Sequence, residues 1–337
     1  MKYFLGIDGG QSHTTALIAD DNGRILGRGD AGASNHTREP GGRERLITAV
    51  TKSVGEALAD AGLAKQPPKG GTTNFKFASA HLGMCGEPEY KIDIVNELLN
   101  AEHLVVGHDA PGGLAGALAG DEGVIVLAGT GSVACGETRD GRFARIGGHG
   151  YMFGDEGSAF AIATDALSVA LAMEDRGSPG ALNKELLAHF KRPTLKAVAE
   201  DFYAGQLSRD RLASFAAKVS KLADRKDPAA MEIMDVAAEA LAEMAIACAN
   251  RLGLYKGKIS FGGGVFKSRM LRNVFAEIIH AELPDAEIVA PRFGPEIGAL
   301  LLAYRQAGKK ITPALLANIT ETQKPQNTKN TKNKNEP

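Results

Sequence analysis

The chain of 337 residues contains no tryptophan and only three cysteines. Cys85, Cys135 and Cys248 lie far apart in the sequence, and none belongs to a Cys-x-x-Cys pair. A zinc site or an iron–sulfur cluster needs closely placed thiolates, so this spacing argues against either one. We expect three reduced thiols, mostly packed inside the protein.

The sequence also shows no excess of charge and no long apolar run, and we expect no signal peptide. Its formal net charge is −1 and no basic stripe is interleaved with aromatic residues, so we expect no nucleic-acid partner. The apolar stretches are rich in alanine and interrupted by charges, so we expect no membrane partner. Strand-like residues begin at once, without the features of a signal peptide, which favours a cytoplasmic location.

Composition and length describe an ordinary globular protein of more than one domain. Hydrophobic residues make up 44% of the chain and charged residues 23%, which is typical of soluble proteins. A chain of this length can bury a large core and divides most naturally into two domains.

A glycine-rich turn lies near the beginning of the chain. The apolar residues 4–7 lead into Asp8-Gly9-Gly10-Gln11-Ser12, and a second apolar stretch follows at residues 16–19. This order predicts a strand, a tight turn and another strand. Backbone N–H groups and hydroxyls of such a turn can hold phosphate oxygens, and an Asp at the strand end can hold hydrated Mg²⁺. An ordinary hairpin has a similar composition, so the stretch alone leaves both interpretations open.

The same arrangement recurs 120 residues later, from Gly9 to Gly129. The apolar residues 124–128 lead into Gly129-Thr130-Gly131-Ser132, and apolar residues follow again. A hairpin signal comes after each copy, at residues 21–24 and 139–142. The repetition predicts two related α/β lobes, each presenting a phosphate-binding turn.

Asp109 is the leading candidate for a catalytic group. It follows an apolar stretch at residues 103–107 and precedes Pro111-Gly112-Gly113. Open α/β sheets bind ligands at the carboxyl ends of their strands, where a carboxylate can accept a proton from an attacking hydroxyl. The alternative is a capping Asp in front of a helix that we expect to start at Leu114.

Two further glycine-rich segments are candidate ligand contacts. Gly262-Gly263-Gly264 follows an apolar strand, so its backbone can approach the α-phosphate or ribose of a nucleotide closely. In residues 154–158, helix capping by itself would explain Asp155 and Glu156. Asp155 could instead accept hydrogen bonds from the hydroxyls of a small polar molecule.

The remaining sequence predicts the domain boundaries. Residues 180–254 have helical periodicity, with breaks at Pro193 and Pro228, and the second break starts a helix that ends at Leu252. We expect an N-terminal lobe at 1–113, a C-terminal lobe with a helical insertion at 114–297 and a closing helix at 298–312. Residues 313–337 are expected to form a largely disordered tail.

Taken together, these motifs resemble the BadF/BadG/BcrA/BcrD ATPase family, and within it the N-acetylglucosamine kinase branch. The family belongs to the sugar kinase, heat-shock chaperone and actin superfamily, and the resemblance covers about residues 3–308. It implies an α/β fold of two ribonuclease-H-like, actin-like ATPase lobes with a nucleotide cleft between them. It also implies ATP and Mg²⁺ as cofactors, an amino sugar as substrate, phosphorylation of the 6-hydroxyl of N-acetylglucosamine, and a homodimer.

The resemblance further implies a role for individual residues. The ATP phosphates would contact Gly9, Gly10, Gln11 and Ser12 in one lobe and Gly129, Thr130 and Gly131 in the other, with Asp8 holding Mg²⁺. Gly263 and Gly264 would contact the nucleotide farther out. The sugar would be surrounded by Asn35, Asp109, Ser132, Gly148, His149, Gly150 and Asp155, with Asp109 acting as the base for the 6-hydroxyl.

Two positions depart from the family pattern near the expected sugar. His149 stands where the sugar kinases commonly have Trp, and Val133 stands where the vertebrate-type enzymes have Asn. The substrate therefore stays open among N-acetylglucosamine, glucosamine and N-acetylmuramic acid. Two other functions are an ATPase activator of a dehydratase, against which the wide spacing of the cysteines argues, and a sugar- and ATP-binding sensor without turnover. Retention of Asp8 and Asp109 argues against the sensor.

Overall fold

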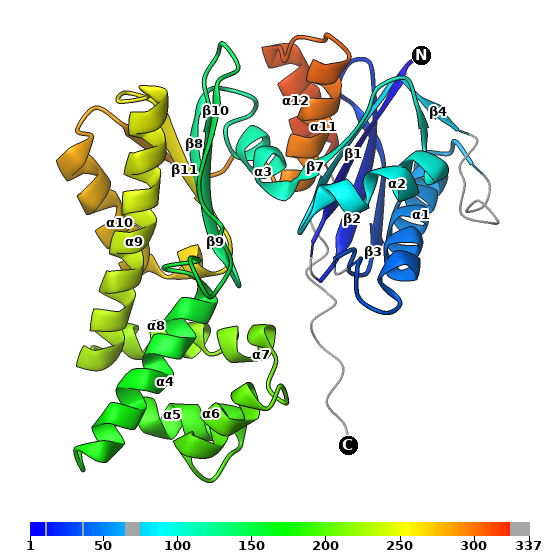
Figure 1. The fold of residues 1–337 in the computed structure, drawn as a ribbon. Coiled ribbons are helices and arrows are strands. Elements are labelled where there is room, and N and C mark those ends of the chain that lie inside the picture. Colours follow the sequence, from blue (N-terminus) through cyan, green and yellow to red (C-terminus); the bar gives the residue numbers. More distant parts are fainter. Residues whose placement is uncertain (11, 36, 65–74, 324–337) are drawn as a thin grey trace. The chain divides into compact units, whose positions relative to one another are not determined.

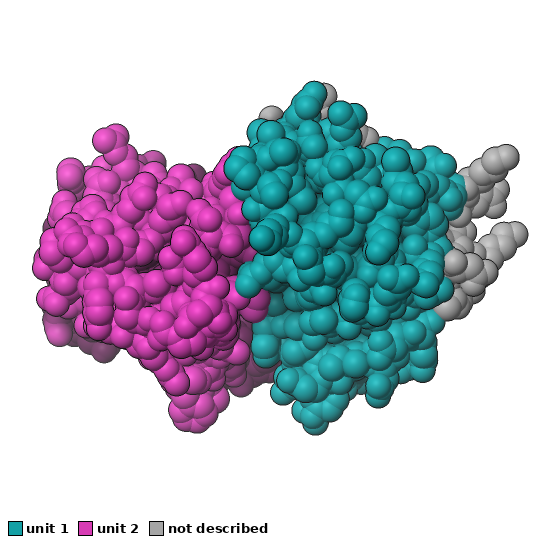
Figure 2. Space-filling model, turned by 90° about the horizontal axis from the view of Figure 1, so that it is seen from above, with its two compact units in different colours: residues 1–109, 299–337 teal, residues 110–298 magenta. Residues whose placement is uncertain are grey.

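The computed structural model describes residues 1–10, 12–35, 37–64 and 75–323, which form two compact units (Figures 1 and 2). Residues 1–109 and 299–337 make up unit 1, and residues 110–298 make up unit 2. Each unit contains a five-stranded sheet, and the strands follow the same order in both. The predicted duplication of an α/β lobe is confirmed.

The sheet of unit 1 combines an antiparallel meander with two parallel strands. Its order is β3 (Ile25–Ala31), β2 (Thr14–Asp20), β1 (Tyr3–Gly9), β5 (Ser79–Met84) and β7 (Leu104–His108). The first three strands are antiparallel neighbours, and β5 and β7 run parallel to β1. Helix α1 (Gly42–Asp60) packs on β2 and β3, and its apolar side chains at positions 46, 50, 54 and 58 are buried.

Smaller elements complete unit 1. The short strands β4 (Lys76–Phe77) and β6 (Asn100–Ala101) pair in parallel. The 3₁₀-helix η1 (Pro88–Tyr90) leads into α2 (Ile92–Leu98), which packs against β7. Helix α11 (Pro295–Gln306) crosses the unit boundary, and α12 (Pro313–Thr322) packs on β3.

The sheet of unit 2 repeats this topology. Its order is β10 (Phe143–Gly147), β9 (Ser132–Glu137), β8 (Gly123–Ala128), β11 (Lys258–Gly262) and β12 (Glu287–Val289). The first three strands are again antiparallel neighbours, and β11 and β12 run parallel to β8. The 3₁₀-helix η2 (Val265–Lys267) connects β11 to α10 (Arg269–Glu282). Helix α10 packs against α9 (Pro228–Leu252), which covers β8, β9 and β10 (Figure 1).

A helical insertion separates β10 from β11. It contains α4 (Ala159–Asp175), α5 (Ala181–Phe190), α6 (Leu195–Tyr203), α7 (Arg209–Ala213), α8 (Ala216–Asp224) and α9. Helix α9 begins and ends where the sequence predicts: Asp227 accepts a hydrogen bond from Ala230 N at 3.0 Å, and Gly253 ends the helix at φ 73°. Among the helices that the structure describes, none has the length and apolar character needed to cross a membrane.

The boundary between the units differs from the expected one. Helix α3 (Asp109–Ala117) begins at Asp109, not at Leu114, and unit 1 ends at residue 109 instead of 113. The reason is burial, since Ala110, Leu114 and Ala117 form one apolar cluster with Ile125 of β8 and strand β9. Helix α3 therefore belongs to the second unit from Ala110 onward.

The expectation of a disordered tail from residue 313 is wrong for its first ten residues, which form α12. Thr312 caps this helix by accepting a hydrogen bond from Leu315 N at 3.2 Å, and Leu315 and Ile319 are buried one turn apart. Thr322 Oγ1 also accepts a hydrogen bond from Ile25 N at 2.9 Å, which joins the helix to β3. The rest of the predicted tail, from residue 324, lies outside the described residues.

The packing of α11 on β1 allows a test of the fold. A Cβ atom on Gly6 of β1 would lie 2.4 Å from Leu300 N, whereas one on Gly107 of β7 would enter open space. We expect Gly6→Ala to lower the free energy of unfolding by about 1–3 kcal/mol, because the two backbones would have to separate. Urea unfolding followed by circular dichroism measures this effect. Gly107→Ala is the matched strand control, and equal midpoints for the two variants would contradict the proposed packing.

Candidate active site

The parallel strands of unit 1 bring Asp8 and Asp109 to one edge of the sheet. Asp8 of β1 is in register with Gly83 of β5, and Met84 is in register with His108 of β7. Asp8 therefore lies near the carboxyl end of β1, and Asp109 follows the carboxyl end of β7 directly. The two residues are two strand spacings apart, or roughly 10 Å. This edge is where open α/β sheets bind ligands.

The first glycine turn is anchored to two neighbouring segments. Cys85 N donates to Gly9 O at 2.8 Å, and Ser34 N donates to Gly10 O at 3.2 Å. A Cβ on Gly9 would lie 2.6 Å from Ser34 Oγ, so only glycine allows this approach. Asn35, the next residue, is only 5% exposed. The structure thus brings Gly9, Gly10 and Asn35 together at the same edge as Asp8.

The other expected phosphate contacts of unit 1 are less constrained. Ser12 is exposed, and Gln11 lies outside the described residues. Their roles therefore stay predictions.

Sequence reasoning missed a buried cation at this edge. Lys91 follows η1 and is 1% exposed, and its Nζ donates to Cys85 O at 2.5 Å. Burial lowers the pKa of Lys91, and Coulombic attraction to Cys85 and Asp109 opposes that shift. Lys91 is thus a buried cation whose charge interacts with that of Asp109. No motif indicated this interaction.

The second glycine turn, between β8 and β9, is fixed to the start of α4. Ala159 N donates to Gly129 O at 2.8 Å, and Phe160 N donates to Thr130 O at 3.3 Å. Ser158 caps α4 by accepting a hydrogen bond from Ala161 N at 3.1 Å. The turn at residues 129–131 and the start of α4 therefore form one local structure.

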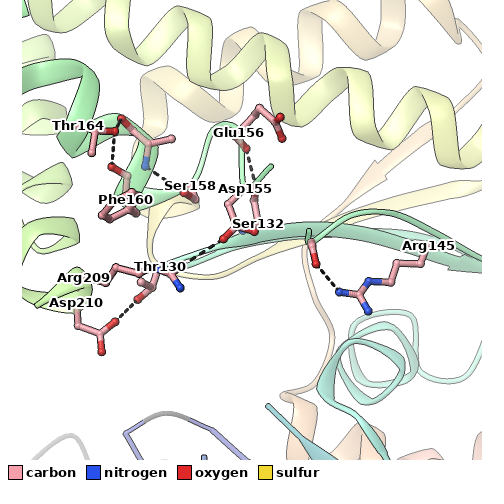
Figure 3. Close-up of polar contacts among 12 residues, drawn as sticks. Thr130, Ser132, Arg145, Asp155, Glu156, Ser158, Phe160, Thr164, Arg209 and Asp210 are labelled. Atoms are coloured by element: carbon pink, nitrogen blue, oxygen red, sulfur yellow. Dashed lines mark hydrogen bonds and ion pairs between the residues drawn. The ribbon is translucent and has the colours of Figure 1, made fainter. Parts of the chain in front are cut away.

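Asp155 packs directly on this turn. Asp155 is buried, with 6% of its surface exposed, and its Oδ1 accepts a hydrogen bond from Ser132 N at 3.4 Å. A Cβ on Gly131 would lie 2.7 Å from Asp155 Oδ2, which explains why glycine occupies this position. Ser132 Oγ donates to Glu156 O at 2.6 Å (Figure 3). The structure thus brings Gly131, Ser132 and Asp155 together, whereas their roles toward phosphate and sugar stay predictions.

Asp155 is also held in an unusual backbone conformation. Its φ is 62°, in the left-handed region that residues other than glycine rarely adopt. Such residues concentrate at ligand-binding and catalytic sites because the surrounding contacts must compensate for the strain. This feature supports a functional role for Asp155 over simple helix capping.

The expected sugar residues 148–150 follow β10. Gly148 and Gly150 have φ of 70° and 87°, and Arg145 Nη2 donates to Gly148 O at 2.8 Å (Figure 3). A Cβ on Gly148 would lie 3.1 Å from Val133 Cγ2, so this loop does lie beside Val133. The side chain of His149 is exposed. The two positions that depart from the family pattern are therefore close in the fold.

The third glycine turn lies next to the second. Gly262 of β11 is in register with Leu127 of β8, and a Cβ on Gly263 would lie 2.3 Å from Ala128 O. Gly263 also has a φ of 95°, which favours glycine. The backbone that follows β11 thus packs on that of β8 at Gly263, which leaves no room for a Cβ atom there.

A cavity of about 480 Å³ opens beside Gly264. Its lining combines the start of α4 and one residue of α9, the connection from β11 to α10, and helices α7 and α8. The lining residues are Ala159, Ile162, Ala213, Ser214, Ala216, Ala217, Ser220, Lys221, Asp224, Met234, Gly264, Val265, Lys267 and Ser268. The volume lies within the range of small-molecule pockets, and the lining mixes apolar, hydroxyl and charged groups.

Comparison with known protein families matches residues 5–303 to the BadF/BadG/BcrA/BcrD ATPase family. The chain belongs to this family. Membership is consistent with two units of the same topology, each with a glycine turn after its first strand.

Several relatives of this ATPase-family member are named as amino-sugar kinases. It is 26% identical to the N-acetylmuramic acid/N-acetylglucosamine kinase of Clostridium acetobutylicum, over 90% of this chain and 98% of that protein. It is 28% identical to the N-acetyl-D-glucosamine kinase of Dictyostelium discoideum, over 90% of this chain and 98% of that protein. A crystal structure of a candidate N-acetylglucosamine kinase from Chromobacterium violaceum superposes with a TM-score of 0.72 at 25% identity, covering 90% of this chain and 99% of that one.

The ATPase family implies a nucleotide with Mg²⁺, and the residues present fit such an ion. No group of three or more His, Cys, Asp or Glu side chains suited to a metal occurs among the described residues. A nucleotide-borne Mg²⁺ takes most ligands from phosphates and water and needs only one or two carboxylates. Asp8 at the start of the first glycine turn can supply one.

Proposed function

We propose that this protein is an ATP-dependent amino-sugar kinase that phosphorylates the 6-hydroxyl of N-acetylglucosamine. The observation that carries the proposal is the position of Asp8 and Asp109 at one sheet edge, with the Gly9–Gly10 turn beside Asp8. Relatives named as amino-sugar kinases match over 98% of their length, which supports the same assignment.

In the proposed reaction, Asp109 acts as the general base. Its carboxylate accepts the proton of the 6-hydroxyl as the sugar oxygen bonds to the γ-phosphorus and the bond to the ADP oxygen breaks. Asn35, buried beside the Gly9–Gly10 turn, orients the sugar in this proposal.

The glycine turns hold the ATP phosphates in this proposal. Gly9 and Gly10 serve in unit 1 and Gly129, Thr130 and Gly131 in unit 2, through backbone N–H groups. Bound to the nucleotide and held by Asp8, Mg²⁺ would neutralise charge on the phosphates. The base and ribose occupy the cavity beside Gly264, where Ser220 and Lys221 can contact polar atoms.

The proposed sugar contacts in unit 2 surround Asp155. Its carboxylate accepts hydrogen bonds from sugar hydroxyls, and Ser132, Gly148, His149 and Gly150 complete the contacts. Glucosamine and N-acetylmuramic acid are the alternative substrates, because His149 and Val133 differ from the family pattern at this position.

The cysteines disfavour the dehydratase-activator alternative. Cys135 and Cys248 are fully buried, and burial raises the pKa of the Cys248 thiol to about 12. A cluster ligand must be a thiolate that the metal can reach. A kinase therefore accounts for the described residues better than an iron–sulfur protein does.

The first test is ADP release from Mg²⁺-ATP with a panel of sugars. The panel contains N-acetylglucosamine, glucosamine, N-acetylmuramic acid, glucose and a control without sugar. We expect N-acetylglucosamine to stimulate ADP release most strongly. Strongest stimulation by another amino sugar would reassign the substrate, and equal release with and without sugar would refute the kinase.

Replacement of the proposed base gives a second prediction. Asp109→Asn keeps the size of the side chain but removes its basicity, so we expect kcat to fall by about 10²–10⁴-fold. Steady-state kinetics measures kcat, and calorimetry tests whether ATP binding is kept. Asp93→Asn, an exposed carboxylate in the first turn of α2, is the matched control. A loss of less than about tenfold would exclude general-base catalysis by Asp109.

Filling the cavity gives a third prediction. Ala217 is exposed at the cavity on α8, so Ala217→Phe can enlarge the side chain without disturbing the core. We expect the KM for ATP to rise by roughly tenfold or more, with the KM for N-acetylglucosamine unchanged. Ala247→Phe, at an exposed position on α9, serves as the control. An unchanged KM for ATP in the Ala217→Phe variant would place the nucleotide elsewhere.

A further inference from the structure

Helix α7 of the insertion contacts both candidate ligand loops of unit 2. Arg209 Nη2 lies 3.3 Å from Asp155 Oδ2, across 54 positions of sequence (Figure 3). Thr130 Oγ1 donates to Asp210 Oδ1 at 3.0 Å, across 80 positions. Arg209 and Asp210, consecutive residues of one helix, thus contact Asp155, the proposed sugar ligand, and Thr130 of the proposed phosphate-binding turn.

Arg209 packs against two aromatic rings. Its guanidinium carbon lies 4.5 Å from the centre of the Tyr151 ring and 5.4 Å from that of Phe160. Its Nε is buried, with no hydrogen-bond partner among the described residues. Stacking on rings fixes the plane of the guanidinium and leaves its Nη atoms to reach Asp155. The arginine is therefore held in place before any ligand binds.

The ion pair compensates for the burial of Asp155. The side chain of Asp155 is 8% exposed and that of Arg209 is 32% exposed, so the pair is partly shielded from water. A buried carboxylate without a cation is strongly disfavoured, and removing one partner of such a pair costs more than the pair itself contributes. The only other described donor to the carboxylate is Ser132 N, at the longer distance of 3.4 Å.

We propose that Arg209 and Asp210 are positioning residues, which couple amino-sugar binding at Asp155 to nucleotide binding at Thr130 through α7. The inference rests on the kinase function proposed above. Arg209 sets the direction of the Asp155 carboxylate, so that its remaining lone pairs face the sugar hydroxyls. Asp210 ties the phosphate turn to the same helix. Because both loops share one anchor, a ligand that orders one loop reduces the cost of ordering the other.

Direct binding of phosphate by Arg209 is a different role that the geometry disfavours. The guanidinium carbon lies over the rings of Tyr151 and Phe160, and Nη2 is paired with Asp155, so this nitrogen is already engaged by a carboxylate. A phosphate ligand would affect the KM for ATP when removed. A residue that orients Asp155 would affect the KM for the sugar instead, because Asp155 binds the sugar in both the ground state and the transition state.

Steady-state kinetics of Arg209→Gln separates these roles. We expect the KM for N-acetylglucosamine to rise by roughly ten- to a hundredfold, since misplacement of a positioning group has effects of this size, with a smaller change in the KM for ATP. Arg209→Lys keeps the positive charge but lacks the planar guanidinium, so we expect its KM for N-acetylglucosamine to lie between those of the unaltered protein and Arg209→Gln. A purely structural role would change both KM values alike and show no such rescue.

Arg211→Gln provides the matched control on the same helix. Arg211 contacts His189 O at 2.9 Å and lies over Phe190, away from Asp155 and Thr130. We expect its kinetics to match those of the unaltered protein. If Arg209→Gln behaves like Arg211→Gln, the positioning role is wrong; if only its KM for ATP rises, Arg209 binds phosphate instead.

The coupling itself is measured by calorimetry. N-acetylglucosamine is titrated into the protein with and without a non-hydrolysable ATP analogue, and we expect the analogue to tighten sugar binding. In Asp210→Ala the ratio of the two Kd values should fall toward one, because the turn is no longer tied to α7. An unchanged ratio would overturn the coupling. A protein that turns over no sugar would instead refute the proposed function, and the inference with it.

Discussion

Both units depend on the parallel pairing of a later strand with the first strand of the meander. In unit 1, β5 pairs with β1, and in unit 2, β11 pairs with β8. This pairing aligns the carboxyl ends of strands that are distant in sequence, so the turn after the first strand meets the segment after the later one. A shift of one residue would turn every side chain to the opposite face of the sheet. The register therefore decides which groups meet at the edge.

In both units, the glycine turn after the first strand also packs closely against neighbouring groups. At Gly9 the neighbouring Ser34 and Met84 side chains leave no room for a Cβ, and at Gly131 the Asp155 carboxylate leaves none. Main-chain groups rather than long side chains therefore line the turns, which suits the recognition of phosphate oxygens. The carboxylates of Asp8, Asp109 and Asp155 are the side chains proposed above to bind the metal ion or the sugar.

The helical insertion adds what the duplicated lobe lacks. Helices α7 and α8 complete the cavity beside Gly264, and α7 contacts Thr130 and Asp155. In unit 1, the described residues between the meander and the parallel strands form α1 and the short strand β4. The two copies have the same sheet, and the second adds a helical layer that can enclose part of a ligand.

Features encoded by local sequence were predicted well, and those that depend on distant partners were not. The ends of α9 follow from Asp227, Pro228 and Gly253, which act on their own backbone. The helix α12 was missed because its stability comes from burial of Leu315 and Ile319, not from its polar composition. The early start of α3 has the same cause, since Ala110 is buried in the cluster with β8.

The sequence by itself determined the duplicated α/β lobe, the three glycine turns, the candidate base Asp109 and the family, because each depends on residues adjacent in the chain. Only the tertiary structure decided that Lys91 lies near Asp109, and that Arg209 and Asp210 reach Asp155 and Thr130. No local pattern marks these residues. Their partners are brought to them by strand pairing and by the packing of the insertion, so the contacts exist only once the chain has folded.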